Sequence, residues 1–359
     1  MDDSKKLLLL ICAFAAISLV MLQTIFPSLV PVQVVAFLLG IAGFLIVGRM
    51  PFAFWRAIAP MLLTGMIVIM LGTYILGKTS KGSTRWISIG VAQAQPSQFA
   101  KPILALALAV LAFKQAQRTK FEHATWLVSI AALPTALVFF QPDLGTSMVL
   151  GAMSLAVFVF WGIPGRYFVV YGAVGLLLAI FAWFFVLKPY QKERVYTLIN
   201  PTNNLSTSGY NALQSQIAVG SGKALGRGLG SGVQSELRFL PERQTDFFFA
   251  SFSENLGFVG NLIVFTLYAT LFYTLDQMIR KTRGKEGKIY SFAILAMLCI
   301  QFTINVGMNI GILPITGITL PLLSYGGSSV LAICLALGLA VSAAREGASR
   351  HQIEIRSFL

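Results

Sequence analysis

The chain has 359 residues, of which 56% are hydrophobic and 11% are charged. Soluble domains usually carry about 25% charged residues, so this composition excludes a soluble globular enzyme, a disordered chain and a disulfide scaffold. The formal net charge is +14, but the basic residues fall between apolar stretches, which excludes a nucleic-acid binder with one basic face. The composition therefore indicates a membrane protein with several spans.

Ten apolar segments define the predicted fold. A membrane-crossing helix needs about 20 mostly apolar residues, and a helix satisfies its own backbone hydrogen bonds in lipid. We therefore predict an all-α, polytopic membrane protein in which residues 1–359 form a single integral membrane domain. The fourth span is short and the eighth is overlong; the ten lie near 7–26, 32–49, 57–76, 99–114, 125–140, 144–163, 167–187, 247–278, 289–310 and 327–344.

Lysine and arginine residues set the expected orientation of the bundle. They occur in one set of short connections and in both terminal segments, and again in two opposite segments, 77–101 and 188–246. Short cytoplasmic loops are enriched in Lys and Arg, so we expect both termini in the cytoplasm. Residues 188–246 then form a long extracytoplasmic loop, whose basic residues either escape the rule because the loop is long or bind something anionic.

Two hydrophilic segments each lead into a span. In 77–101, Pro96 suits the first turn of a helix and places Lys101 just inside the fourth span, where a lysine ordinarily extends its amine to the interface. In QPDLGTS, residues 141–147, Asp143 lies where negative charge stabilises a helix N-terminus by about 0.3–1 kcal/mol. From these residues alone we expect an extended Lys101 and a capping role for Asp143.

Glycines in the long loop suggest a phosphate-binding segment but do not match the nucleotide-binding template. The motif GxxxxGK[ST] would need Gly and Ser or Thr where this chain has Ile217 and Ala224, so we expect no nucleotide cofactor. Backbone amides beside cations still suit a pyrophosphate, and a flexible turn is an equal alternative. Lys223 and Arg227 lie among the glycines, which are Gly220, Gly222, Gly226, Gly228, Gly230 and Gly232.

Asp246 is the main candidate for a functional acid. Pro241 is expected to start a helix on which Arg243 and Asp246, three residues apart, face each other. Asp246 directly precedes Phe247 at the mouth of a span, and a carboxylate at membrane depth costs about 2.5–3.5 kcal/mol on insertion scales. Such a residue is a functional candidate by default, and a surface ion pair between Asp246 and Arg243 is an equal alternative.

Cysteine and histidine residues give no sign of metal or triad chemistry. Cys12, Cys299 and Cys334 lie in apolar runs without CxxC spacing, so we expect packing residues rather than disulfides or metal ligands. His123 and His351 lie in hydrophilic connections, so we expect neither a histidine metal cluster nor a Ser–His–Asp triad.

Several sequence blocks, taken together, resemble the SEDS family (shape, elongation, division and sporulation), and specifically its RodA-type members. The run LPERQTDF at 240–247 favours the RodA type over the related FtsW type. The resemblance covers nearly the whole chain; its blocks are Arg85–Trp86, 95–101 (QPSQFAK), 141–147 (QPDLGTS), 190–195 (YQKERV), 209–247, Glu254 with 256–260 (LGFVG), and 305–329.

The resemblance implies an enzyme that polymerises peptidoglycan in cell elongation and the maintenance of rod shape. Such an enzyme joins lipid II units at the outer face of the bacterial cytoplasmic membrane and releases undecaprenyl pyrophosphate. It implies that Asp246 is the essential carboxylate, and we expect an inverting glycosyltransferase. Candidate residues for binding pyrophosphate or sugar are Lys101, Arg194, Lys223 and Arg243, and candidate supporting residues are Glu254, Asp143, Gln98 and Ser324.

Partners and cofactors follow from the same resemblance. It implies lipid II as substrate, membrane lipid as surroundings and a class B penicillin-binding protein, a single-pass transpeptidase, as partner; nucleic acid is not expected. A divalent cation, Mg²⁺ or Mn²⁺, is compatible with the chemistry. Two positions depart from the family pattern: Gln98 stands where the family usually has Glu, and Asn255 where it usually has a second acid.

Two rival functions remain, a lipid II flippase and a non-catalytic scaffold. Transporters commonly contain discontinuous helices in two related halves, but this chain shows no internal repeat, and its unusual polar residues gather on the outer side. We therefore favour the enzyme. Because Asp246 and Lys101 each start a span at the outer boundary, we also predict that they approach within about 4 Å as an ion pair.

Overall fold

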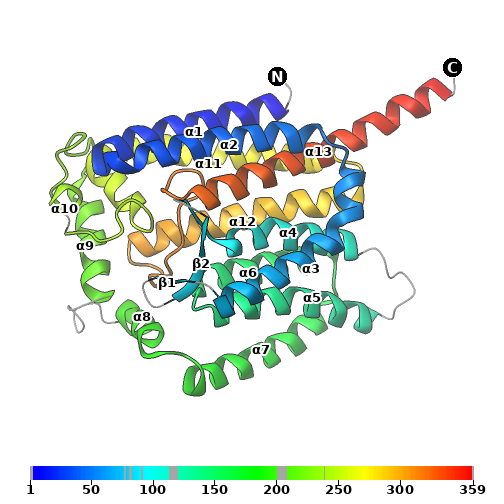
Figure 1. The fold of residues 1–359 in the computed structure, drawn as a ribbon, viewed down its shortest axis with the longest axis horizontal. Helices are drawn as coiled ribbons and strands as arrows, with labels where there is room; N and C mark the ends of the chain where they lie inside the picture. Colours follow the sequence, from blue (N-terminus) through cyan, green and yellow to red (C-terminus); the bar gives the residue numbers. More distant parts are fainter. Residues whose placement is uncertain are drawn as a thin grey trace.

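Ten long helices build the computed structural model, which describes residues 3–76, 78–80, 83–89, 92–112, 120–199, 208–237 and 239–357 (Figure 1). Each corresponds to one predicted span, so the predicted all-α membrane fold is confirmed. They are α1 (Asp3–Ile25), α2 (Val30–Arg49), α3 (Phe52–Leu76), α4 (Pro96–Leu111), α5 (Lys120–Phe140), α6 (Leu144–Trp161), α7 (Gly165–Phe185), α11 (Phe248–Lys281), α12 (Lys285–Asn309) and α13 (Gly327–Ser357).

Nine of these helices, within the described ranges, are long and apolar enough to cross a membrane. The tenth is α4, which the sequence also marks as short; it has 16 residues, and Pro96 occupies its first turn as expected. Helix α7 lies at the edge of the bundle (Figure 1), and none of its most apolar window is buried inside the protein. Its apolar side chains are therefore available to lipid.

Short elements fill the two segments that were expected to be extracytoplasmic. Strands β1 (Lys78–Ser80), β2 (Ser83–Ile89) and β3 (Ala92–Ala94) form an antiparallel sheet in the order β1-β2-β3, which the sequence did not predict, and β2 packs against α3 and α4. The long loop contains three helices, and a 3-10 turn η1 joins α1 to α2; these elements are α8 (Pro189–Ile199), α9 (Ser208–Ser221), α10 (Val233–Glu236) and η1 (Pro27–Leu29).

Small residues let α2 and α13 approach closely. A Cβ built on Gly338 would lie 2.7 Å from Phe44 O, and one on Gly40 would lie 3.0 Å from Cys334 Sγ. Close backbone approach of this kind is the usual way in which helices pack in a membrane. Cys334 is buried in this contact, as expected of a packing residue, whereas Cys299 is partly buried and Cys12 is exposed; all three are free thiols.

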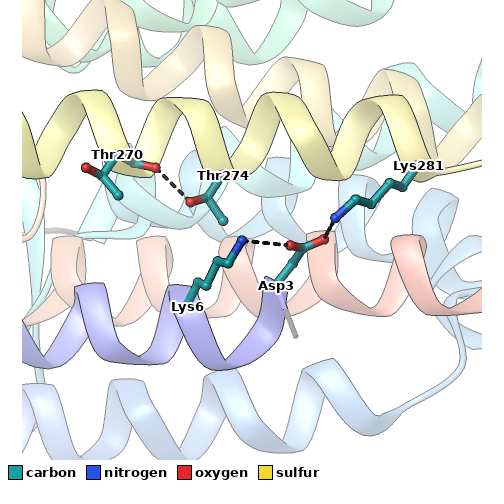
Figure 2. A network of polar contacts seen from close by, with 5 residues as sticks. All are labelled: Asp3, Lys6, Thr270, Thr274 and Lys281. Carbon is teal, nitrogen blue, oxygen red and sulfur yellow. Dashed lines mark hydrogen bonds and ion pairs between the residues drawn. The ribbon is translucent and has the colours of Figure 1, made fainter. Parts of the chain in front are cut away.

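The two chain ends lie at the same end of the bundle (Figure 1), where ion pairs connect helices distant in sequence. Asp3 Oδ2 accepts from Lys281 Nζ at 2.7 Å and Asp3 Oδ1 lies 3.7 Å from Lys6 Nζ, so α1 is tied to the last turn of α11 (Figure 2). Arg56 Nη1 on α3 lies 2.9 Å from Glu286 Oε2 on α12. These pairs occupy the end that carries the predicted cytoplasmic charges.

Helix α11 is broken at Gly257, where φ is 64° and ψ is −161°. A break in a helix frees backbone carbonyl and N–H groups that need new partners. The glycine-rich segment 222–230 supplies them: Arg227 N donates to Glu254 O at 2.9 Å, Gly228 N to Asn255 O at 3.0 Å, Phe258 N to Lys223 O at 2.9 Å and Val259 N to Ala224 O at 3.0 Å.

Only glycine fits at the closest point of this contact. Gly226 has φ +80°, and a Cβ on it would collide with the backbone oxygen of Asn255. A Cβ on Gly222 would collide with the backbone oxygen of Ser253 in the same way. Since both obstacles are main-chain atoms within a packed helix, they cannot simply rotate aside. Gly222 and Gly226 thus serve close packing against the broken helix.

We therefore expect Gly226→Ala to lower the free energy of unfolding by about 3 kcal/mol, through backbone strain and collision. Gly220→Ala is the matched control, because nothing lies within 4 Å of its Cβ position and it lies within α9. Thermal unfolding of the detergent-solubilised protein measures both. Equal melting temperatures for the two variants would contradict the packing role of Gly226.

Candidate active site

Asp246 lies in a run of turns that precedes α11. Residues 241–247 are turns, and the helix begins at Phe248, so the prediction that Pro241 starts a helix is wrong. The reason is local: Glu242 adopts a left-handed conformation with φ 51°, and its carbonyl accepts from two N–H groups further along the turn. A residue with positive φ does not continue a right-handed helix.

The prediction that Arg243 and Asp246 share one face of a helix is consequently wrong. Arg243 Nη2 donates to Ile25 O at 3.2 Å, and its guanidinium lies 5.4 Å from the centroid of the Phe26 ring. Ile25 is the last residue of α1, and Phe26 begins the connection to α2. Arg243 therefore ties the turn that carries Asp246 to the start of the bundle.

The connection between α12 and α13, residues 310–326, lies beside the Asp246 carboxylate. Gly317 has φ +76°, and a Cβ on it would lie 3.4 Å from Asp246 Oδ2. Arg194 of α8 donates from Nη1 to Thr316 O at 3.3 Å. This connection therefore brings a carboxylate and a guanidinium from distant parts of the sequence to adjacent residues.

Two buried asparagines on α12 hold the backbone at Asp246. Asn305 Nδ2 donates to Asp246 O at 3.0 Å and to Ile318 O at 2.6 Å, and Asn309 Nδ2 donates to Asp246 O at 3.1 Å. Sequence reasoning assigned no role to either residue. The available signal was two amide side chains four positions apart in an apolar span, since such residues share a helical face and are costly in a membrane.

Ser324, a candidate supporting residue, lies at the backbone next to Asp246. Its Oγ donates to Thr245 O at 2.7 Å and accepts from Leu320 N at 2.9 Å. The next residue continues the contact, because Tyr325 N donates to Gln244 O at 2.8 Å. The 310–326 connection is therefore hydrogen-bonded to the turn that carries Asp246 at successive residues.

Lys101 belongs to a separate buried polar chain. Lys101 Nζ donates to Gln98 Oε1 at 2.6 Å, Gln98 Nε2 to Gln95 Oε1 at 3.2 Å, and Gln95 Nε2 to Asp143 Oδ2 at 2.9 Å. Lys101 is only 2% exposed. The expectation that its amine extends to the interface is therefore wrong. Among the described residues no ion pair joins Lys101 to Asp246, so that prediction is also wrong.

Asp143 has the predicted capping role and a second one. It is the N-cap of α6, and its Oδ1 accepts from Thr146 N at 3.1 Å. Its Oδ2 also accepts from Ser97 Oγ at 3.2 Å, in addition to the glutamine of the polar chain. The helix that it caps meets the Asp246 region, because a Cβ on Gly145 would lie 2.7 Å from Thr316 O. The polar chain and Asp246 thus adjoin the same connection.

The two departures from the family pattern fit their surroundings. Gln98 uses both ends of its amide, accepting from Lys101 and donating to the next glutamine, which a Glu in the same place could not do. Asn255 Nδ2 donates to Ser251 O at 2.8 Å, and its Oδ1 accepts from Gly230 N at 3.0 Å. At each position the amide therefore serves as both donor and acceptor.

Lys223 lies away from these contacts, in the segment that clasps the break in α11. Lys223 is exposed and adopts a left-handed conformation with φ 48°. The expectation that this segment cradles a pyrophosphate with backbone amides is not supported, because the amides that would do so donate to α11: Arg227 N to Glu254 O, Gly228 N to Asn255 O and Gly230 N to Asn255 Oδ1.

Glu254 is directed to α10 rather than to Asp246. Its carboxylate, fully buried, accepts from Gln234 N at 2.8 Å, Ser235 N at 3.0 Å and Ser235 Oγ at 2.6 Å. Main-chain N–H groups in the first turn of a helix are favourable partners for a carboxylate. The contacts of Glu254 therefore fix α10 to the outer half of α11.

The polar chain gives a test of Asp143. Asn and Asp cap helices about equally well, so Asp143→Asn would be neutral if capping were the whole role. We instead expect a loss of about 2 kcal/mol, because an amide nitrogen would face the Gln95 donor and the charge opposite Lys101 would be removed. Asp276→Asn, at a partly exposed acid of α11, is the matched control. Equal melting of wild type and Asp143→Asn would contradict the network.

Comparison with known proteins identifies the family of this chain. The family model described as cell cycle protein, covering FtsW, RodA and SpoVE, matches residues 6–349. The peptidoglycan glycosyltransferase MrdB of Escherichia coli strain K12 is 34% identical over 307 residues, which are 85% of this chain and 82% of that protein.

Solved structures give the same result. A chain from a peptidoglycan synthase complex that coordinates polymerization and crosslinking superposes with a TM-score of 0.82 at 28% identity, covering 95% of this chain and 97% of that one. The rod shape determining protein RodA of Thermus thermophilus superposes with a TM-score of 0.72 at 25% identity, covering 95% and 96%. With its ten helices and its matching blocks, this chain belongs to the FtsW/RodA/SpoVE family of cell cycle proteins, with RodA-type relatives.

Proposed function

We propose that this chain is a peptidoglycan glycosyltransferase that joins lipid II units, with Asp246 as its base. The main observation is the placement of Asp246: two asparagine amides hold its backbone, and its carboxylate lies beside the connection that also receives Arg194. The relatives named as peptidoglycan glycosyltransferases support the reaction class.

In the proposed reaction, Asp246 takes the proton of the 4-hydroxyl of the acceptor sugar. The hydroxyl oxygen forms a bond to C1 of the lipid-linked donor while the bond from C1 to the pyrophosphate oxygen breaks. Undecaprenyl pyrophosphate leaves with the bonding electrons, and C1 is inverted. A retaining reaction would need a second carboxylate close to the first as nucleophile, and the contacts of Glu254 direct it to α10 instead.

The leaving pyrophosphate needs positive charge where its own charge develops. Arg194 is the first candidate, because its guanidinium contacts the residue next to Gly317, which borders Asp246. Lys101 is the second candidate. Its chain of hydrogen-bonded glutamines ends at Asp143, which caps α6, and α6 packs on the same connection. Arg243 and Lys223 have contacts elsewhere and are weaker candidates.

The proposal extends to partner and location. A class B penicillin-binding protein is the proposed partner, in line with the synthase complex among the structural relatives. We place the protein in the bacterial cytoplasmic membrane, among membrane lipid, with Asp246 facing outward. Asp246 precedes the first residue of α11, and the other end of that helix carries Lys281, which pairs with Asp3 near the N-terminus. A flippase needs polar access from both sides, whereas the residues that hold Asp246 gather at one end.

Asp246→Asn is expected to reduce polymerisation by about 1,000-fold or more, the range of a general base, while the protein stays folded. Asp276→Asn, the same change at a partly exposed acid of α11, is expected to keep wild-type turnover. Purified full-length protein with its transpeptidase partner is supplied with lipid II in detergent, and gels resolve the glycan strands. Full activity of Asp246→Asn would remove Asp246 from the mechanism, and inactivity of the wild type would favour the flippase.

A divalent cation, Mg²⁺ or Mn²⁺, is part of the proposal. No group of three or more His, Cys, Asp and Glu side chains in the described part of the chain could hold a metal. Mg²⁺ is commonly bound by one or two carboxylates together with substrate phosphates, so Asp246 with the pyrophosphate would suffice. We expect EDTA to abolish polymerisation and added Mg²⁺ or Mn²⁺ to restore it; unchanged turnover in EDTA would exclude the cation.

A further inference from the structure

We infer that Asn305 is a positioning residue that sets the spacing between the Asp246 carboxylate and the connection contacted by Arg194, with Asn309 as its second support. This inference rests on the proposed role of Asp246. It concerns how the base is held in place, and neither asparagine needs to touch substrate.

The chemistry of the contacts determines which end of the Asn305 amide is used. The two partners of its amide nitrogen, Asp246 O and Ile318 O, are both main-chain carbonyl oxygens and can only accept hydrogen bonds. The amide nitrogen has two N–H groups, one for each carbonyl. Asn305 thus joins the turn before α11 to the connection after α12 through both of its donors.

The two joined carbonyls flank the candidate site. Asp246 carries the proposed base, and Ile318 directly follows Gly317, whose Cβ position lies 3.4 Å from the Asp246 carboxylate. Arg194 contacts Thr316 O, two residues before Ile318. A change in the Asn305 contacts would therefore alter the distance between base and guanidinium, while leaving both side chains present.

Burial makes these contacts hard to replace. Asn305 and Asn309 are both fully buried, so removal of their donors would leave the Asp246 carbonyl without its side-chain partners in a region with little access to water. Asn309 is itself held, because Ser215 Oγ donates to its Oδ1 at 3.1 Å and to its backbone oxygen at 3.0 Å. The two asparagines thus also link the base to α9 of the long loop.

The test compares Asn305→Ala, Asn309→Ala and Asn261→Ala in full-length protein, with lipid II and the transpeptidase partner. Asn261 is the matched control: it is also a buried asparagine of a membrane helix, and its Oδ1 accepts from Ser253 Oγ rather than contacting the turn that carries Asp246. We expect kcat to fall about 100-fold in Asn305→Ala, the size of effect that a small misplacement of a catalytic group produces. KM for lipid II is expected to stay unchanged.

Asn309→Ala removes one of the two amides at Asp246 and is expected to lose about 10-fold in kcat, between the control and Asn305→Ala. In an Asp246→Asn background, Asn305→Ala is expected to add no further loss, because residues that act as a unit are not additive. Melting temperatures measured beside kcat separate misfolding from mispositioning.

Wild-type kcat in folded Asn305→Ala, with Asp246→Asn inactive, would overturn the inference and leave the proposed base in place. If Asn305→Ala does not fold, Asn309→Ala decides in the same way. An active Asp246→Asn would instead refute the proposed function itself. A loss of kcat in Asn261→Ala equal to that in Asn305→Ala would show general destabilisation and overturn the positioning role.

Discussion

The need of every buried backbone group for a hydrogen-bond partner shapes this protein more than any single charge. In lipid no water replaces a missing partner, so each departure from regular helix must be matched by another part of the chain. The break at Gly257 is matched by the segment 222–230, and the turn before α11 is matched by Asn305, Asn309 and Ser324. At these two places the irregular backbone is therefore shared between two elements.

Buried charges follow a related rule. Lys101 and Asp143 are both nearly inaccessible, yet they are joined through two glutamine amides rather than in a direct pair. Removing a charge from water is costly unless hydrogen bonds compensate for the lost solvation. The oriented amides provide that compensation, so an uncharged residue at position 98 is consistent with a stably folded site. The opposite charges balance each other across a distance.

The spans were predictable because hydropathy is a local property, summed over about 20 neighbouring residues. The Asp143 cap was also predictable, because a helix cap depends on residues that are neighbours in the sequence. The partner of an amide or a charge depends instead on tertiary contacts, so Lys101 was wrongly assigned to Asp246, and Asn305 was missed although its donors reach Asp246. The glycines of 222–230 resembled an anion site because close packing and phosphate binding select the same small residue.

The interruption of α11 has a mechanical consequence. Helical hydrogen bonds do not run unbroken past Gly257, so α11 consists of two helical halves joined at one glycine. Both halves are hydrogen-bonded to segment 222–230 at the break, and Glu254 also fastens the first half to α10. The far end of the second half pairs with Asp3. A push on segment 222–230 would therefore act on both halves of α11 at the break, including the half that begins beside the proposed base.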